Sequence, residues 1–498
     1  MPATLLGPCT REPSQGYDLK RDNDAQAGRD KQLPRWRVSW TRGLLVALPL
    51  VFLGFGLAAW LRGWALGVDS SVYRAGAMLL LHGGSSYDAS DLGYLHLSFT
   101  YPPAAALLFA PLASLPAQLA WAIMAAASAL ALALTIRAAI ATGPYWRFPG
   151  AQTTLLLTVV MMCLVPVWRT IGLGQVNILL MAMVVVDVLA VTARGSRWGG
   201  LLVGVAAAVK LVPLIFVLHL LLTGKRVAAA RALAVFVALQ GLALAIAPRD
   251  AAYWTSYLFK TNRIGPAQQP YNQSLDGLMA RLTGTAPWSA DTAWAIGALL
   301  AVPALMLVLR YHRRGQNLSA LCVTACLGLL VAPVSWLPCW VWVVPVLVAL
   351  VSWLQDTWRG TARWKRWTGV GAVIGVIAVF TSTYSVPISE QHRRTLGSFW
   401  FFVLSNSYVL ATIAIAVVLG AAALRFRGNA AARATSAGLG APAVVPGVDD
   451  RGFPVAGDPA FQVEQGSGGH QVAELGVSVV PGVEVGTLLG DDGADAAQ

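Results

Sequence analysis

Long apolar segments recur along most of this chain, and they constrain its fold more than any other feature. Each is close to the roughly 20 residues that a helix needs to cross the hydrocarbon layer of a bilayer. No water-soluble core requires uninterrupted segments of that length. The segments lie near residues 44–61, 101–117, 118–141, 152–168, 176–193, 199–223, 227–247, 291–309, 318–334, 337–355, 368–385 and 398–421. They predict an all-α polytopic membrane protein with about 12 transmembrane helices, in a range of about 11 to 13.

The composition excludes a water-soluble globule. Of the 498 residues, 56% are hydrophobic and only 12% are Asp, Glu, Lys or Arg, whereas soluble domains carry about 25% of these charged residues. The formal net charge of +13 indicates basic cytoplasmic loops rather than nucleic-acid binding, because no compact basic module is present. The five cysteines are an odd number and lie mostly in apolar segments, so they predict neither a disulfide framework nor a metal site.

Basic residues predict the orientation of the helices, because Lys and Arg concentrate in cytoplasmic loops. Basic clusters occur in the tail and at residues 225–226, 310–314 and 359–366. Twelve spans with both termini inside place all of these in the cytoplasm. Loops 62–100, 248–290 and 386–397 then fall outside. Arg194 and Arg197 do not fit this scheme unless some helices are broken or half-length.

Two places suit such broken helices. Glycine, proline and polar residues interrupt the apolar segments near 172–177 and 210–213. Irregular backbone at membrane depth is tolerated only where it lines a cavity in the protein. We therefore expect a cavity beside both interruptions.

Three regions follow along the chain. Residues 1–43 form a basic cytoplasmic tail, residues 44–423 a membrane domain, and residues 424–498 an acidic tail rich in Gly, Ala and Pro. The acidic tail has too few large apolar side chains to form a core, which predicts disorder in the cytoplasm. The segment 44–61 begins late and has no small-residue cleavage site after it, so it is expected to be a retained first span rather than a signal peptide.

Carboxylates are nearly absent from the predicted spans, where Asp187 is the main exception, and they gather with aromatic residues and amides in the external loops. Transporters and channels tend to place ionisable groups inside their spans, so this distribution favours a site that opens at the membrane surface. In loop 62–100, Asp69 and Tyr73 are spaced as on one face of a short surface helix. Asp69 could also be a helix N-cap and nothing more.

A series of short motifs runs through the middle of the chain. They are Asp69 with Tyr73 and the Tyr87-Asp88 pair, Tyr101-Pro102-Pro103, Gly174-Gln175-Val176-Asn177, Gly204 before Lys210-Leu211-Val212-Pro213, Asn272-Gln273-Ser274-Leu275 with Gly277 and Arg281, and Pro333-Val334-Ser335-Trp336. Together, over about residues 60 to 350, they resemble glycosyltransferase family 87. The resemblance implies the GT-C fold, with short surface helices in the external loops. It also implies an enzyme that takes sugar from a polyprenyl-phosphate donor at the external face, with Asp69 as the catalytic carboxylate.

The chemistry of the residues suits such a reaction. Displacement at an anomeric carbon needs a base for the acceptor hydroxyl proton, and ionised Asp69 can serve. The leaving group is a phosphate, so the protein should supply cations and not a second carboxylate. Lys210, midway along an apolar segment, is the best candidate, and its alternative role is snorkelling or pairing with Asp187. Arg263 and Arg281 could also meet phosphate or sugar, although exposed loop arginines are mostly just solvated.

The residues predicted to bind the donor phosphate or sugar are Lys210, Tyr73, Tyr101, Gln175, Asn177, His219, Asn272, Gln273, Arg281 and Trp336. Some have structural alternatives. Gln175 and Asn177 should point to opposite faces, which favours hydrogen bonds to broken backbone over a shared sugar contact. The amides at 272–273 could bind sugar or order a turn. His219 could be a satisfied buried histidine.

The chain departs from the family after Trp336. Relatives usually carry a His-His pair there, whereas this chain continues Leu337-Pro338-Cys339. No imidazole can act at this place, which implies a different acceptor, another group in that role, or reduced activity. Trp336, with the tryptophans at 340 and 342, could form a surface that stacks on a sugar or an interfacial belt.

The predicted function is inverting transfer of a sugar, mannose in the family, to a hydroxyl of a glycolipid or cell-wall glycan at the outer face of the plasma membrane. No metal is expected, because the external loops contain no Asp-x-Asp and because the family resemblance implies a metal-independent enzyme. No other cofactor is expected. The expected partners are the polyprenyl-phosphate donor, the acceptor and membrane lipids, with no nucleic acid. The alternatives are a transporter or flippase of a lipid-linked sugar, and a catalytically silent homologue.

Overall fold

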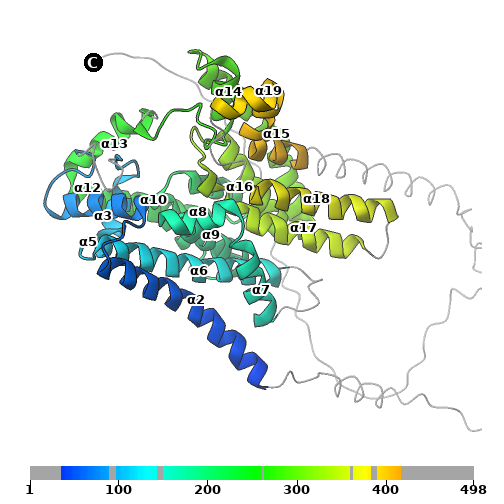
Figure 1. Cartoon of the computed structure of the whole chain (residues 1–498), viewed down its shortest axis with the longest axis horizontal. Coiled ribbons are helices and arrows are strands. Elements are labelled where there is room, and N and C mark those ends of the chain that lie inside the picture. Colours follow the sequence, from blue (N-terminus) through cyan, green and yellow to red (C-terminus); the bar gives the residue numbers. More distant parts are fainter. Residues whose placement is uncertain are drawn as a thin grey trace, which may run out of the picture. The chain divides into compact units, whose positions relative to one another are not determined.

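The computed structural model describes residues 35–88, 97–142, 150–260, 263–358, 363–382 and 390–416 (Figure 1). Every named element in these ranges is a helix, and an isolated β-bridge joins Asn272 to Trp336. The predicted all-α class is confirmed for this part of the chain. The predicted acidic tail at 424–498 lies outside it, as do residues 1–34 of the basic tail, while residues 35–43 begin helix α2 (Arg35–Leu61).

Four helical stretches in the described ranges are long and apolar enough to cross a membrane. They are α6 (Ala117–Ala141), α12 (Arg226–Ile246), α15 (Ser289–Arg313) and Leu337–Gln355, which joins η6 (Leu337–Trp342) to most of α17 (Val343–Thr357). Two bent pairs raise the number to six: α7 (Ala151–Met161) with α8 (Val165–Leu173) at 81°, and Ser398–Ser405, the end of α19 (Glu390–Ser405), with Ser407–Ala416 at 72°. The described helices of spanning length therefore do not reach the predicted twelve.

Most of the remaining helices are shorter. They are α3 (Val68–Leu81), α4 (Pro103–Leu108), α5 (Ala110–Ala113), α9 (Asn177–Val186), the π-helix η1 (Asp187–Thr192), α10 (Leu201–Val209), η2 (Val212–Leu214), α11 (Ile215–Leu222), η3 (Pro248–Ala251), α13 (Ala252–Thr255), η4 (Tyr257–Phe259), α14 (Leu275–Thr283), α16 (Asn317–Val331) and α18 (Arg363–Thr381). Several are apolar helices of 10–17 residues, which agrees with the expectation of half-length helices.

The apolar segment at 101–117 is not a spanning helix, so that prediction was wrong. It forms α4 and α5, of six and four residues, each with a proline in its first turn. Proline suits a first turn but cannot continue a helix from the preceding residues. Pro116 then lies at the N-cap of α6. The helix is therefore interrupted within an apolar segment, an interruption that hydrophobicity alone does not reveal.

Both predicted helix interruptions are confirmed. Helix α8 ends at Gly174, whose φ of 69° is left-handed, and α9 begins at Asn177. Helix α10 ends before Lys210, whose backbone is extended at φ −148° and ψ 136°. Helices η2 and α11 continue the chain from there. As shown below, the interruptions lie beside one cavity, as irregular backbone in a membrane protein requires.

Helices α2 and α6 lie side by side (Figure 1). Their contact is close: a Cβ added at Gly56 would lie 2.3 Å from the Cβ of Ala122. Helices in a membrane are held by dispersion contacts rather than by the hydrophobic effect, so small residues that allow close approach stabilise the pair. This pair supports α3, which packs on α6 and carries Asp69.

The first two predicted external loops contact each other through Asp250 in η3. This buried carboxylate accepts hydrogen bonds through Oδ1 from Ser85 Oγ at 2.6 Å and from Ser86 N at 3.2 Å. Beside it, the Tyr87 ring lies 5.7 Å from Tyr253 between centroids, in a stacked arrangement. The loops are therefore held against each other, which positions the residues that line the cavity described next.

Candidate active site

A cavity of about 460 Å³ lies where both helix interruptions meet the two loops. Among the described residues, its wall contains one carboxylate, Asp69, and four cationic side chains, Arg169, Lys210, Lys260 and Arg263. Among the predicted site residues, Asp69, Tyr73, Tyr101, Gln175, Lys210 and Trp336 also line it. The cavity is therefore suited to an anionic ligand that must meet a single base.

Asp69 lies in the first turn of α3, but its carboxylate does not cap this helix. The N-cap of α3 is Gly67, with φ 69° and no side-chain cap. Asp69 Oδ2 instead accepts a hydrogen bond from Gln175 Nε2 at 3.0 Å. Burial raises the pKa of Asp69 to about 6, although the Gln175 hydrogen bond and the Lys210 charge act in the opposite direction. Asp69 is thus a stronger base than an exposed aspartate, yet is still mostly ionised at neutral pH.

A relay of polar side chains connects Asp69 to Lys210. Gln175 donates to Asp69 and accepts through Oε1 from Asn177 Nδ2. Asn177 Oδ1 in turn accepts from Lys210 Nζ at 3.1 Å. The prediction that the two amides point to opposite faces was wrong: the Asn177 side chain bonds to that of Gln175, because Gln175 precedes α9 and does not follow its helical periodicity.

Lys210 does not pair with Asp187, the alternative that the sequence left open. Asp187 accepts hydrogen bonds from the backbone N–H groups of Gly200 at 2.8 Å and Val203 at 3.0 Å, so it caps the start of α10. Lys210 Nζ contacts Asn177 and Cys339 Sγ, the latter at 3.4 Å, and lies 5.9 Å from the centre of the Tyr101 ring. The charge is therefore held in the cavity.

Two tyrosines form the floor beside the carboxylate. The hydroxyl oxygens of Tyr73 and Tyr101 are 2.8 Å apart, and the Tyr73 ring stacks on Phe109 with a centroid separation of 4.4 Å. Burial raises the pKa of Tyr73 well above its ordinary value. Both phenols therefore stay protonated and can donate hydrogen bonds to a bound ligand or to each other.

The opposite wall contains cations, two of which sequence reasoning missed. Arg169 lies 5.0 Å from the centre of the Tyr271 ring, and Arg263 lies 4.2 Å from that of Tyr257. Lys260 also approaches Tyr257, at 5.9 Å. Sequence reasoning considered Arg263, but Arg169 resembles an interfacial charge at the end of an apolar segment, and Lys260 resembles a solvated charge in an external loop. No pattern in the sequence distinguishes these two residues from solvated ones. Only their position in the same cavity does so.

The amides at 272–273 do not line the cavity but secure the loop behind it. Asn272 Oδ1 accepts from Ser335 N at 3.0 Å, and Gln273 Nε2 donates to Ser405 O at 2.7 Å. Both side chains are fully buried. The structure favours the ordered-turn alternative for this pair. They hold the segment that presents Trp336, whose ring would lie 3.0 Å from a Cβ added at Gly265.

Arg281 and His219 also lie away from the cavity. The Arg281 guanidinium donates to Asn406 Oδ1 at 2.6 Å and to Gln269 O at 2.8 Å, and burial lowers the pKa of Arg281 to about 10. His219 Nδ1 lies 2.8 Å from Thr324 Oγ1 and is buried. The structure therefore favours the buried-histidine alternative for His219 and a packing role for Arg281.

Cys339 lies in the cavity wall, in the segment after Trp336 where the family resemblance predicts a His-His pair. It is buried and contacts Lys210. A thiol is a weak donor and acceptor and carries no positive charge at neutral pH, so it cannot neutralise a phosphate as a histidine can. Cations elsewhere in the wall, such as Arg169 and Arg263, are available for that role. Among the described residues, no group of three or more His, Cys, Asp and Glu side chains could hold a metal.

Gly174 offers a direct test of how the relay is positioned. A Cβ at this left-handed residue would lie 2.6 Å from Ser70 Oγ on α3, whereas a Cβ at Gly172 would meet nothing within 4 Å. We expect Gly174→Ala to lower the free energy of unfolding by about 2 kcal/mol and Gly172→Ala to change it little. Thermal melting of the purified variants measures this difference. Equal melting temperatures for the two variants would contradict the close contact between α3 and the end of α8.

The fold and the cavity define a helical membrane protein whose buried base and surrounding cations suit group transfer from an anionic substrate. The glycosyltransferase family 87 model matches residues 99–333. A polyprenol-phosphate-mannose-dependent alpha-(1-2)-phosphatidylinositol mannoside mannosyltransferase of Mycobacterium tuberculosis is 32% identical over 403 residues, which are 74% of this chain and 90% of that protein. The chain therefore belongs to glycosyltransferase family 87 and is an enzyme.

Two further proteins extend the comparison. A polyprenol-phosphate-mannose-dependent alpha-(1-2)-phosphatidylinositol pentamannoside mannosyltransferase of M. tuberculosis is 33% identical over 362 residues, covering 70% of this chain and 79% of that protein. The crystal structure of ArnT from Cupriavidus metallidurans bound to undecaprenyl phosphate aligns over 83% of each chain, at 17% identity and a TM-score of 0.36. That structural similarity is too low to support a conclusion about this chain.

Proposed function

We propose that this enzyme transfers mannose from a polyprenyl-phosphate donor to a hydroxyl of a glycolipid or cell-wall glycan, with inversion and with Asp69 as the general base. The observation that carries the proposal is the relay from Asp69 through two amides to Lys210 in one cavity. The base and a cation are thereby held in one hydrogen-bonded arrangement. The transporter alternative is not retained, because the family consists of glycosyltransferases.

The proton transfer follows from the position of Asp69. Oδ2 is occupied by the Gln175 hydrogen bond, which leaves Oδ1 to accept the proton of the acceptor hydroxyl. As that oxygen forms a bond to the anomeric carbon, the bond from this carbon to the phosphate oxygen breaks. The electron pair leaves with the polyprenyl phosphate, and the proton remains on Asp69 until it is released to water. A single carboxylate is enough, because phosphate needs no general acid.

The cations supply what the leaving group needs. Charge accumulates on the phosphate as the bond breaks, and fixed positive groups in a partly dehydrated cavity stabilise it more than water does. Lys210 is positioned by Asn177, and Arg169 by the face of Tyr271. Tyr73 and Tyr101 are available to donate to sugar hydroxyls. The identity of the sugar comes from the relatives, both of which are named as polyprenol-phosphate-mannose-dependent.

The proposal includes the GT-C fold, an external active site and cytoplasmic termini. Its support is the distribution of charge: basic clusters at 225–226 and 310–314 are separated from the cavity by apolar helices such as α15. Single cysteines introduced at Lys260 and at Lys225 test this orientation in intact cells. We expect a membrane-impermeant thiol reagent to label position 260 and not 225, and the reverse pattern would invert the topology.

Transfer is tested with vesicles that contain the purified full chain. Radiolabelled polyprenyl-phosphate-mannose is supplied with a glycolipid extract, and labelled lipids are separated. Phosphatidylinositol mannosides are the first acceptors to try, since the relatives' names contain them. Appearance of a mannosylated lipid supports the proposal. Absence of transfer to lipid and glycan acceptors alike, with donor binding intact, would identify a catalytically silent homologue, the alternative that Cys339 raises.

The pH dependence follows from the base. Asp69 accepts a proton only when ionised, and its pKa is about 6, so the transfer rate should fall as the pH drops through about 6. An unperturbed aspartate would place this fall near about 3.9. Gln175→Met removes a hydrogen bond that lowers the pKa of Asp69, so the fall should shift to higher pH. Rates from about pH 4.5 to about pH 8 measure both profiles.

The control for this shift is Gln118→Met. Gln118 donates to Trp64 O near the surface and does not line the cavity, so its pH profile should match that of the unmodified enzyme. If Gln175→Met lowers the rate equally at every pH, the amide does not act on the ionisation of Asp69.

A further inference from the structure

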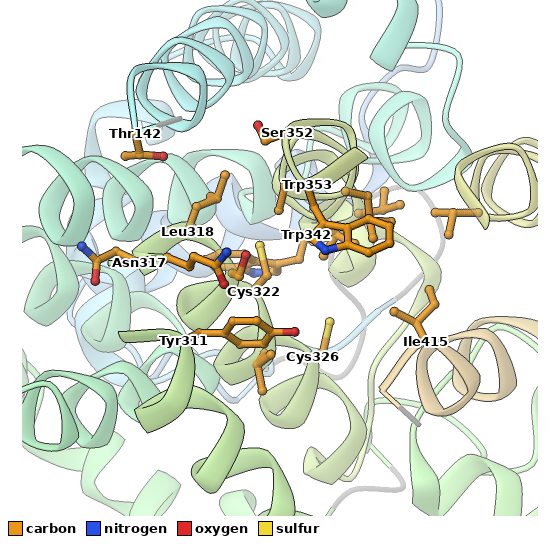
Figure 2. A pocket seen from close by; sticks show the side chains of 18 of the residues that line it. Thr142, Tyr311, Asn317, Leu318, Cys322, Cys326, Trp342, Ser352, Trp353 and Ile415 are labelled. Carbon is orange, nitrogen blue, oxygen red and sulfur yellow. The ribbon is translucent and has the colours of Figure 1, made fainter. Parts of the chain in front are cut away.

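A second cavity, of about 350 Å³, lies among α15, α16, α17 and α18 (Figure 2). One end is polar, with Arg314, Gln316 and Asn317 from the turn between α15 and α16. The remainder is mostly apolar and extends toward Trp353 and Ile415, which lie across the cavity from Asn317 in Figure 2. A cavity with a polar end and an apolar body matches a ligand of the same character.

This cavity opens at the opposite end of the bundle from the catalytic cavity. Helix α16 begins at Asn317, beside the polar end, and ends at Val331. The next residues, 332–334, line the catalytic cavity. Helix α15 runs the other way, from the α14 side to the basic turn, and its 25 residues correspond to about 38 Å, enough to cross a bilayer. The two cavities therefore face opposite leaflets.

The polar end carries positive charge. Arg314 lines the cavity and is exposed at its rim, and the described lining contains no carboxylate. Arg310 and Arg313 precede it by four residues and by one residue at the end of α15, and neither lines the cavity. A lipid phosphate placed at this rim would meet a guanidinium, which binds phosphate through paired hydrogen bonds.

We propose that this cavity holds one acyl chain of an anionic phospholipid from the leaflet opposite the active site, with the lipid phosphate on Arg314. The apolar body, lined by side chains such as Val346, Ala349 and Phe380, takes the chain. Arg314, exposed at the rim, selects an anionic over a zwitterionic headgroup. The donor phosphate belongs at the other end of α16, so this occupant is a separate lipid.

The site would act on the catalytic cavity through η6. Trp340 and Trp342 of η6 line the lipid cavity, while Cys339, directly before Trp340, contacts Lys210. Trp342 also borders a small void that Lys210 and Asn177 share. A bound chain fills the space behind η6 and stabilises the wall that holds Lys210. Anionic lipid should therefore raise the melting temperature of the protein.

The full chain, purified in detergent, is titrated with phosphatidylglycerol or phosphatidylcholine and examined by native mass spectrometry. We expect one tightly retained phosphatidylglycerol, bound about tenfold better than phosphatidylcholine. Arg314→Gln should remove this preference. Ala349→Phe should reduce retention of both lipids by filling the cavity. Arg313→Gln, a matched arginine that does not line the cavity, should keep the preference, because its side chain meets no bound phosphate.

Three results would overturn the proposal. The first is an unchanged preference for phosphatidylglycerol in Arg314→Gln. The second is unchanged lipid retention in Ala349→Phe, provided that this variant melts at the same temperature as the unmodified protein. The third is displacement of the bound lipid by polyprenyl phosphate, which would assign the cavity to the donor chain. None of these measurements uses sugar transfer, so they are independent of the proposed catalytic function.

Discussion

Asp69→Asn is expected to lower the rate of sugar transfer by about 10³-fold, within the range that a general base contributes. Asparagine keeps the shape of the side chain and can still accept the Gln175 hydrogen bond that Asp69 Oδ2 accepts now. It cannot take the acceptor proton at any pH. Initial rates in vesicles, at saturating donor, measure the loss, and protein amount and melting temperature should stay close to those of the unmodified enzyme.

The matched control for Asp69 is Asp291→Asn. Asp291 is exposed in the first turn of α15 and does not line the cavity, so its variant should transfer sugar at the normal rate. Asp69→Glu retains a base but moves it by one methylene, and an intermediate rate is expected. A rate within about twofold of normal for Asp69→Asn would reject the assignment of the base.

Lys210→Met should lower the transfer rate by about 10²-fold, the loss that follows removal of one positive or donor group from a developing anion. Methionine has a similar length but no charge, so the phosphate loses a cation and Asn177 Oδ1 loses its donor. The KM for the donor should rise as well, since the ground-state phosphate is also an anion. Kinetics over a range of donor concentrations separate the two effects.

Two further variants define what Lys210 contributes. Lys210→Arg keeps the charge and should therefore be faster than Lys210→Met. If Lys210 contributed only packing, the arginine variant would not recover the rate. Lys225→Met removes an exposed lysine from the turn before α12 and should leave the kinetics unchanged. Equal rates for Lys210→Met and the unmodified enzyme would exclude this lysine from phosphate stabilisation, leaving Arg169, Lys260 and Arg263 as the remaining cavity cations to test.

The sequence was a good guide where a residue acts through its own chemistry in an unusual setting. A lysine in the middle of an apolar segment and a carboxylate in an aromatic loop both predict function, and both line the cavity. It was a poor guide where the same residue type in two motifs has different partners. Gln175 lies in the cavity wall, whereas Gln273 bonds to the backbone of the distant Ser405.

The helix count shows the same limit. Hydrophobicity predicts burial in lipid or protein but not where a helix is interrupted, so residues 101–117 looked like a span and fold as α4 and α5. The breaks at 172–177 and 210–213 were predictable because glycine and proline act on the local backbone.

The sequence by itself determined that this is a helical membrane protein of glycosyltransferase family 87, with Asp69 and Lys210 as its leading candidate groups. These properties follow from segment length, local backbone chemistry and motif order, which are all readable along the chain. Only the tertiary structure decided that Arg169 and Lys260 share the cavity and that Asp187 caps α10 instead of pairing with Lys210. The physical reason is that hydrogen bonds and charges act over a few ångströms in space, and distance along the chain does not determine which groups come that close.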